Sequence, residues 1–222
     1  MKVIRILVLC STSALALCGL AMVYMASVRG TYVPGVNLIQ TRHAVTPEMA
    51  EQVKKLDRKI GKFFQLPDTS GKPVAIGGQG PKPQFIYFVK KGCPCSYDAE
   101  PIFHKLYDQF AGKIDFISVT DADMASAKQW AKDLEVPYPV VADPKIDVME
   151  AYEAPAATYI SLLDQNGLIV KRWAGYSQDY LKEMNEDMSK LIGEPAQPFD
   201  AQYAPKIKTT GCAFDNYQET KQ

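Results

Sequence analysis

The sequence carries no net charge and contains few histidines. Its 25 lysine and arginine residues balance 25 aspartate and glutamate residues, and among 222 residues only His43 and His104 are histidines. Because no basic field is present, binding to nucleic acid is not expected. Two histidines also leave few imidazole ligands for a metal ion.

Cysteines are few, and those outside the N-terminal apolar segment are odd in number. Cys10 and Cys18 lie in that segment, and Cys93, Cys95 and Cys212 lie in the remainder of the chain. Three thiols allow at most one internal disulfide and leave one thiol over. This pattern excludes a secreted domain held together by several disulfides.

A phosphate-binding loop is also missing. The glycine-rich run Gly77–Gly80 lacks the Gly-Lys-Ser/Thr sequence of such loops, and Pro81 would stop a helix from starting there. Nucleotide binding is therefore not expected, and the sequence predicts no cofactor.

The N-terminus has a long stretch without charge. Residues 6–28 form a run of 23 uncharged residues after the basic start Lys2 to Arg5. The apolar region of a secretory signal is usually about 7–15 residues long, whereas a bilayer span needs about 20. We therefore predict that residues 1–28 anchor the chain in a lipid bilayer, with the following domain facing the periplasm or exterior. A cleaved signal is the alternative, and would leave a periplasmic or secreted protein.

The central stretch begins with Phe85–Val89, an apolar run with the length of a buried strand. Lys90-Lys91-Gly92 ends it, and Cys93-Pro94-Cys95 follows. A helical apolar pattern then starts at Ile102. The cysteines therefore lie near a helix N-terminus, where free N–H groups and the helix dipole stabilise a thiolate.

Several segments of this chain together resemble the redoxin group of the thioredoxin superfamily. They are Phe63–Val74, Phe85–Val89 with Gly92–Ser96, and Tyr159–Val170 with its Asp164-Gln-Asn-Gly167 turn. The group includes peroxiredoxin-like proteins of the alkyl hydroperoxide reductase and thiol-specific antioxidant (AhpC/TSA) type, and membrane-anchored thiol–disulfide oxidoreductases. The resemblance covers residues 60–192. It implies a thioredoxin-like α/β fold and a thiol-based redox activity.

The order of elements agrees with this fold. Residues 29–60 read as a linker followed by a helix that starts at Thr46-Pro47. Residues 61–193 predict the order β-α-β-α-β-α-β-β-α, hence a mixed sheet flanked by helices. Residues 194–222, rich in proline and polar residues, predict an extended C-terminal tail that contains Cys212.

Thiol–disulfide exchange is the first functional hypothesis. Cys93 would attack the disulfide of a protein or of a small thiol compound, and Cys95 would resolve the mixed disulfide. Thioredoxins have two residues between the cysteines, whereas this chain has one. The resemblance further implies that Pro155 is a cis-proline facing the cysteines. Cys212 is a candidate second resolving thiol. The sequence identifies no electron donor.

Peroxide reduction by Cys93 is the second hypothesis. Peroxiredoxins carry Pro-x-x-x-Thr/Ser-x-x-Cys. Counted back from Cys93, the hydroxyl position holds Lys90 and the proline position holds Ile86; counted from Cys95 they hold Gly92 and Phe88. Peroxidase activity therefore ranks below exchange.

Binding or delivery of Cu(I) is the third hypothesis, because thiolates are soft ligands that select this ion. Copper carriers of this fold use a distal histidine as third ligand, and His104 is better explained as a solvated or packed residue. A site formed by Cys93, Cys95 and Cys212 is conceivable. Asp115, Asp121 and Glu100 are candidate proton carriers for the redox hypotheses, and the sequence does not choose among them.

Overall fold

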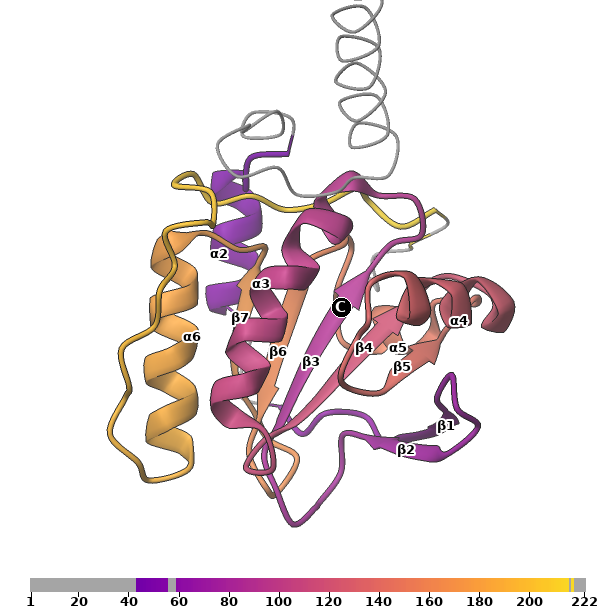
Figure 1. Cartoon of the computed structure of the whole chain (residues 1–222), viewed down its shortest axis with the longest axis horizontal. Coiled ribbons are helices and arrows are strands. Elements are labelled where there is room, and N and C mark those ends of the chain that lie inside the picture. The colour runs from indigo at the N-terminus through magenta and orange to yellow at the C-terminus, as the bar shows by residue number, and fades with distance from the viewer. Residues whose placement is uncertain (1–42, 56–58, 216, 218–222) are drawn as a thin grey trace, which may run out of the picture. The chain divides into compact units, whose positions relative to one another are not determined.

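The computed structural model describes residues 43–55, 59–215 and 217. Its helices and strands are α2 (Pro47–Lys55), β1 (Phe64–Pro67), β2 (Pro73–Ile76), β3 (Gln84–Val89), α3 (Pro94–Phe110), β4 (Asp115–Thr120), α4 (Met124–Asp133), β5 (Val140–Ala142), α5 (Asp147–Ala151), β6 (Tyr159–Leu163), β7 (Ile169–Ala174) and α6 (Gln178–Leu191). From β3 onward the order β-α-β-α-β-α-β-β-α is the predicted one (Figure 1).

Among the residues described, none of the helices combines the length and hydrophobicity needed to span a membrane. The segment for which the sequence predicts an anchor, residues 6–28, lies outside that part of the chain, as does most of the predicted linker. The anchor thus stays a prediction.

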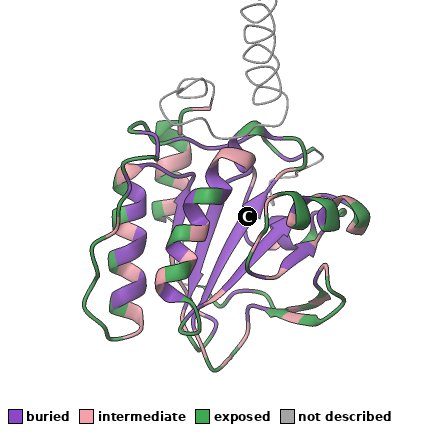
Figure 2. Ribbon diagram, in the orientation of Figure 1, coloured by how far each residue is buried: buried purple, intermediate pink, exposed green. Residues whose placement is uncertain are grey.

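Five strands form the central sheet in the order β5-β4-β3-β6-β7. β3 pairs in parallel with β4 and antiparallel with β6, and β7 returns antiparallel beside β6. All six residues of the middle strand β3 are buried, because helices cover both faces of the sheet (Figure 2). This explains why the strand has a continuous apolar run instead of an alternating pattern. The predicted mixed sheet is confirmed.

Two apolar layers lie on the two faces of the sheet. α3, α4 and α6 cover one face, where Phe103 of α3 packs against Phe85 of β3 with ring centroids 5.8 Å apart. α2, α5 and the β1–β2 hairpin cover the other, where Tyr152 after α5 lies 6.0 Å from the ring of Phe88. Figure 1 shows α3 and α6 in front of the sheet. Buried aromatic side chains of this kind supply much of the area that stabilises a fold.

α5 begins later than the sequence predicts. The pair Asp143-Pro144 predicts a helix start, because aspartate is a common N-cap residue and proline fits the first helical position. The helix begins at Asp147. Asp143 instead accepts hydrogen bonds from the backbone N–H groups of Asp147, Val148 and Met149 at 3.0, 2.9 and 3.2 Å. The carboxylate therefore caps the helix from four residues away, across a turn in which Ile146 has a φ of 56°.

The C-terminal tail runs back over the domain instead of extending from it. After α6, Gln197 accepts a hydrogen bond from Asn185 of that helix at 2.8 Å. Farther on, Thr209 and Tyr176 exchange two backbone hydrogen bonds of 2.8 and 2.9 Å, so the tail pairs with the segment that follows β7. Figure 1 shows this yellow segment passing along α6 and then across the end of the sheet. The tail predicted for residues 194–222 therefore docks on the domain over its described part, and this docking carries Cys212 back toward the sheet.

Gly175→Ala should destabilise the protein more than Gly71→Ala. Both glycines have positive φ, 98° and 86°, so alanine costs about 1–3 kcal/mol of backbone strain at either position. At Gly175 the added Cβ would also overlap the backbone of Thr209, whereas at Gly71 nothing lies within 4 Å. We expect a further loss of about 1–3 kcal/mol at Gly175, measured by urea unfolding. Equal losses for the two variants would contradict the docking of the tail beside β7.

Candidate functional site: three cysteines at the end of β3

Cys93 lies where the central strand passes into α3. Lys90–Gly92 form the connecting turn, and Gly92 adopts a φ of 73° that favours glycine. Cys93 is the N-cap residue in an extended conformation, and Pro94 occupies the first turn, where its missing N–H costs no hydrogen bond. The predicted location of the thiol at a helix N-terminus is confirmed.

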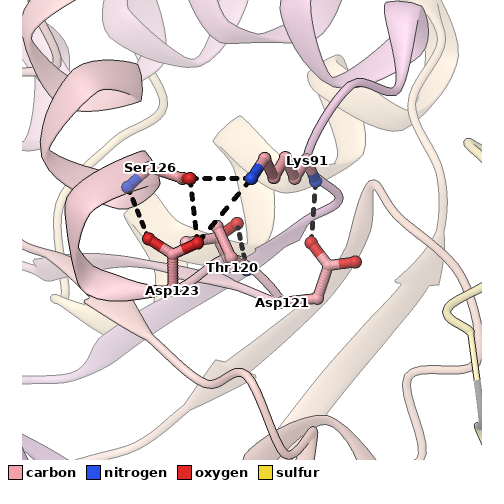
Figure 3. A network of polar contacts seen from close by, with 6 residues as sticks. Lys91, Thr120, Asp121, Asp123 and Ser126 are labelled. Atoms are coloured by element: carbon pink, nitrogen blue, oxygen red, sulfur yellow. Dashed lines mark hydrogen bonds and ion pairs between the residues drawn. The ribbon is translucent and has the colours of Figure 1, made fainter.

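A polar network holds the turn in front of Cys93 (Figure 3). The backbone N–H of Lys91 donates to Asp121 Oδ1, and its Nζ donates to Ser126 Oγ, both at 2.7 Å. Asp123 accepts from the N–H of Ser126 and caps α4. Since the partners of Lys91 follow β4, the network ties together the ends of two parallel strands. The backbone leading to the thiol is thereby fixed from a neighbouring element.

Cys95 lies beneath Cys93 and stabilises its ionised form. Only 2 % of Cys93 is exposed, and Cys95 is fully buried. A hydrogen bond from the Cys95 thiol, assisted by the backbone N–H groups of Cys212 and Ser96, lowers the pKa of Cys93 to about 4, against the opposing effect of burial. The same hydrogen bond, together with burial, raises the pKa of Cys95. At neutral pH the pair is therefore a Cys93 thiolate and a Cys95 thiol.

The tail brings the third cysteine to the same place. The backbone N–H of Cys212 donates to Cys93 Sγ at 3.2 Å. The flanking backbone is held by Ala157, whose carbonyl accepts from the N–H of Gly211 and whose N–H donates to the carbonyl of Cys212, both at 2.9 Å. A Cβ on Gly211 would lie 2.7 Å from that of Ala157 and 3.1 Å from Cys93 Sγ, so only glycine fits.

The Cys212 thiol differs from Cys95 in its access and in its neighbours. It is partly exposed, and its Sγ lies 3.9 Å from His43 Nε2. Burial and the hydrogen bond with Cys93 raise the pKa of Cys212 to about 11. Cys212 is thus a protonated thiol next to a thiolate, with an imidazole within reach.

The predicted cis-proline is wrong in its geometry. Residues 43–55, 59–215 and 217 contain no cis peptide bond, so Pro155 is trans. Its carbonyl accepts from the N–H of Phe214 of the tail at 3.0 Å. Ala157, two positions later, lies against Gly211 of the tail, next to Cys93. Thr158 follows Ala157 and has a φ of 61°.

The acidic candidates lie in three different environments. Glu100 is fully buried in α3, where it accepts a 2.6 Å hydrogen bond from Tyr138. Asp115 pairs in register with Gln84, at the opposite end of β3 from Cys93. Asp121 is bound to the Lys91 backbone. None of these contacts joins a carboxylate to a cysteine sulfur.

Asp98 is an acidic residue of the site that sequence reasoning missed. Burial, with a further contribution from the charge of Cys93, raises the pKa of Asp98 to about 6. It sits three residues after Cys95, a spacing that places two side chains on one helix face. That spacing was the available signal.

Lys90 was missed as well. Its Nζ donates to the carbonyl of Ala213 and pairs with Asp215, each at 2.8 Å, so it clamps the tail beyond Cys212. Nothing local in the sequence marks either this contact or that between His43 and Cys212. For metal binding, the described part of the chain holds no group of three His, Cys, Asp or Glu side chains arranged around an ion.

Comparison with known families gives one match. The model of the AhpC/TSA family matches residues 57–172 of this chain, which include both cysteines of the Cys-Pro-Cys turn. No curated protein matches the sequence.

Solved structures share the fold at low sequence identity. An uncharacterized conserved protein from Geobacillus kaustophilus superposes with a TM-score of 0.58 at 17 % identity, over 74 % of this chain and 93 % of that one. A protein described as the thiol:disulfide interchange protein DsbE, from Chlorobium tepidum, gives 0.57 at 18 % identity, over 63 % and 100 %. The bacterioferritin comigratory protein of Xanthomonas campestris, whose structure concerns alkyl peroxide reduction, gives 0.54 at 15 %, over 62 % and 98 %. The fold is therefore thioredoxin-like.

A substitution of Cys95 should raise the pKa of Cys93 only if it removes the hydrogen-bond donor at position 95. A hydrogen bond to a charged group is worth about 1.5–3 kcal/mol, which corresponds to about 1–2 pH units. Cys95→Ala removes the donor, so the midpoint of Cys93 ionisation should rise by that amount from about pH 4. Cys95→Ser keeps a donor and should stay close to the wild-type midpoint.

The measurement is the rate of iodoacetamide alkylation at Cys93 as a function of pH, with the modified peptide quantified by mass spectrometry. The wild-type rate should be level above about pH 5, because the folded pKa lies below that range. A rate that climbs through pH 8–9 in the wild type would show that Cys93 is an ordinary thiol.

Proposed function

Since the chain belongs to the AhpC/TSA family, we propose that it is a thiol–disulfide oxidoreductase whose attacking group is the thiolate of Cys93. The observation that carries this proposal is the site itself: a thiol whose pKa is about 4, next to two further thiols. A thiolate is the nucleophile in disulfide exchange, and a neighbouring thiol is what releases the product.

The reaction has two halves. The Cys93 sulfur attacks one sulfur of a client disulfide, a bond forms between the two, and the other client sulfur leaves as a thiol after taking up a proton. A second thiol of the site then attacks Cys93, forms an intramolecular disulfide and releases the remaining client thiol. The client is reduced by two electrons and the enzyme is oxidised by two. A dithiol donor of lower reduction potential must restore the reduced site.

Exchange is favoured over peroxide reduction by the groups that surround Cys93. Its contacts are a thiol and backbone N–H groups, and the positions that would carry an orienting hydroxyl hold Lys90 and Gly92. Ser96, the nearest hydroxyl in sequence, accepts from the N–H of Lys90 at 3.2 Å. Peroxide reduction through a sulfenic acid on Cys93 is the alternative that the family keeps open.

Cys93→Ser should abolish disulfide exchange. Serine at this position lacks an accessible thiolate, so turnover of a fluorescent peptide disulfide in the presence of dithiothreitol should fall at least about 1000-fold, to the background rate. Circular dichroism of the variant gives the folding control. Hydrogen peroxide consumption is measured on the same preparations.

Two results would replace this assignment. Retained turnover in Cys93→Ser, combined with loss in Cys95→Ser, would reverse the roles of the two cysteines. Peroxide consumption that depends on Cys93, with no exchange by the wild type, would make the protein a peroxidase. Copper bound to protein purified without oxygen would instead support the Cu(I)-binding hypothesis.

We also propose that the domain acts outside the cytoplasm, held by residues 6–28 in the bilayer or freed by cleavage. The proposal is supported by the uncharged run of that segment and by the basic residues before it. The full chain should resist carbonate extraction, and its redox domain should be digested by protease added to spheroplasts. A domain protected from protease in intact spheroplasts would place it in the cytoplasm and refute the proposal.

A further inference from the structure

The geometry of the tail points to a second catalytic assignment. We propose that Cys212 is the resolving thiol, that His43 accepts its proton, and that residues 209–215 form a strand that closes over Cys93 and delivers Cys212 to it. We call residues 209–215 the closing strand. The inference rests on the proposed function, because it assigns the second half of the same exchange.

The closing strand is held as a polypeptide would be held in a sheet. Beyond the two backbone hydrogen bonds with Ala157, its Ala213 forms an antiparallel bridge with Ala156, and the N–H of Phe214 donates to Pro155. Such backbone pairing is the mode by which an extended peptide adds to an exposed strand. The strand thus lies over a sulfur that is 2 % exposed, and it must leave before a client disulfide can reach Cys93.

One attachment of the closing strand is weak enough to allow this release. Beyond Cys212 the strand is attached by the Phe214 N–H, by the buried Phe214 side chain and by Lys90. The ion pair of Lys90 joins its side chain, 14 % exposed, to Asp215, which is 86 % exposed, so this contact is solvated on one side and adds little. Phe214 is buried in the second apolar layer and supplies the force that returns the strand.

His43 is fixed beside Cys212 by the same strand. The N–H of Thr210 donates to the carbonyl of His43 at 2.8 Å, and the N–H of Val45 donates to the carbonyl of Lys208 at 2.9 Å. The segment that carries the imidazole is therefore paired with the tail on both sides of the contact, and His43 Nε2 lies 3.9 Å from Cys212 Sγ. A thiol next to an imidazole is the standard arrangement for an activated sulfur nucleophile.

Cys95 is poorly placed for the resolving role. It lies in the first turn of α3 with no exposed surface, and its thiol already donates to Cys93. A disulfide between Cys93 and Cys95 would close a very short loop, which is a strained arrangement. Its contribution to exchange is the hydrogen bond that keeps Cys93 ionised.

The resolving step transfers one proton and exchanges one disulfide bond for another. Once Cys93 carries the client in a mixed disulfide, the Cys212 thiol gives its proton to His43 Nε2. Cys212 Sγ attacks Cys93 Sγ, the bond between Cys93 and the client sulfur breaks, and the client thiolate takes the proton from the imidazolium. The products are a Cys93–Cys212 disulfide and a second molecule of client thiol.

The charged and titratable groups that bear on Cys212 come from several elements. Cys93 and Cys95 precede or begin α3, and the Cys93 charge raises the pKa of Cys212 while Lys90 acts in the opposite direction. Asp98 of α3 interacts with Cys93, and His43 comes from the segment before α2. Formation of the mixed disulfide removes the Cys93 charge, so ionisation of Cys212 becomes easier at the step that needs it.

Counting the thiols released in a single turnover tests the assignment. Reduced full-length protein is mixed with excess symmetrical disulfide of the tetrapeptide Thr-Gly-Cys-Ala, without external reductant. The wild type should release two equivalents of peptide thiol and form a Cys93–Cys212 disulfide, mapped by mass spectrometry. Cys212→Ser should release one equivalent and retain the peptide on Cys93. Cys95→Ser keeps a hydrogen-bond donor beside Cys93 and should still release two equivalents, whereas a resolving role for Cys95 would limit that variant to one.

His43→Gln tests the proton acceptor. Release of the second thiol at pH 7 should slow about 100-fold, while release of the first is unchanged. The deficit should shrink as the pH rises, because the Cys212 thiol then ionises without help from the imidazole. His104→Gln, which changes the other histidine, should match the wild type at every pH. A structural role of His43 would give a deficit that does not change with pH.

The outcomes separate this inference from the proposed function. Two equivalents released by Cys212→Ser, or a wild-type disulfide that maps to Cys93–Cys95, would overturn the inference and leave the exchange reaction standing. A wild type that releases no thiol at all would overturn both.

Discussion

The buried negative charge on Cys93 is the constraint on which the rest of this structure depends. A thiolate with 2 % of its surface exposed has lost nearly all of its water, and a buried charge is unfavourable unless protein donors replace that water. Three residues supply donors: Cys95 through its thiol, Ser96 through its N–H, and Cys212 through both its N–H and its thiol. The first two residues belong to the start of α3, and the third belongs to the tail. The helix alone therefore supplies an incomplete shell, and the shell closes only when residues 209–215 lie in place.

Much of the surrounding architecture keeps that third donor in position. Gly175 allows the chain after β7 to approach the carbonyl of Thr209, and Gly211 allows the tail to pass between Ala157 and Cys93. Lys90, from the turn that carries Cys93, holds the far side. The Lys91 network fixes the same turn against β4. The segments that meet at the sulfur are distant in sequence but are tied to the ends of β3, β4 and β7, so the sheet sets the geometry of the site.

Local patterns in the sequence predict the part of the fold that depends on local physics. The apolar run Phe85–Val89 marks the buried strand, and Thr46 and Ser177 mark helix starts because each side chain accepts from a backbone N–H three residues later. Cys93 at the start of α3 follows from the same strand-to-helix boundary. The start of α5 was misplaced, because Asp143 acts as a cap across a turn instead of directly before the helix.

Contacts between distant residues are what the sequence could not establish. Cys212 and Cys93 are 119 positions apart, and Cys212 and His43 are 169 apart, so no periodicity or spacing connects them. The sequence made Cys212 a candidate resolving thiol but did not show how it reaches Cys93, and it gave no sign of the contact with His43. The cis-proline failed for a related reason: a family pattern was transferred to Pro155, but its peptide bond is trans, and both Pro155 and Ala157 form hydrogen bonds with the tail. A pattern taken from a family does not show how the loop that carries the proline is folded in this chain.

The spacing of the two adjacent cysteines is the reason for assigning the resolving role to a third. With one residue between them, Cys93 caps α3 from outside the helix while Cys95 enters its first turn and is completely buried. There its thiol can donate to Cys93 from below, but it is hidden from any molecule that approaches from solvent. A buried donor makes the nucleophile stronger, yet a resolving thiol must reach the sulfur along the side opposite the departing client. A segment that can leave the site and return would first let the client reach Cys93 and then bring the resolving thiol to it. The tail, docked by backbone pairing and one exposed ion pair and carrying a partly exposed cysteine beside a histidine, has those properties.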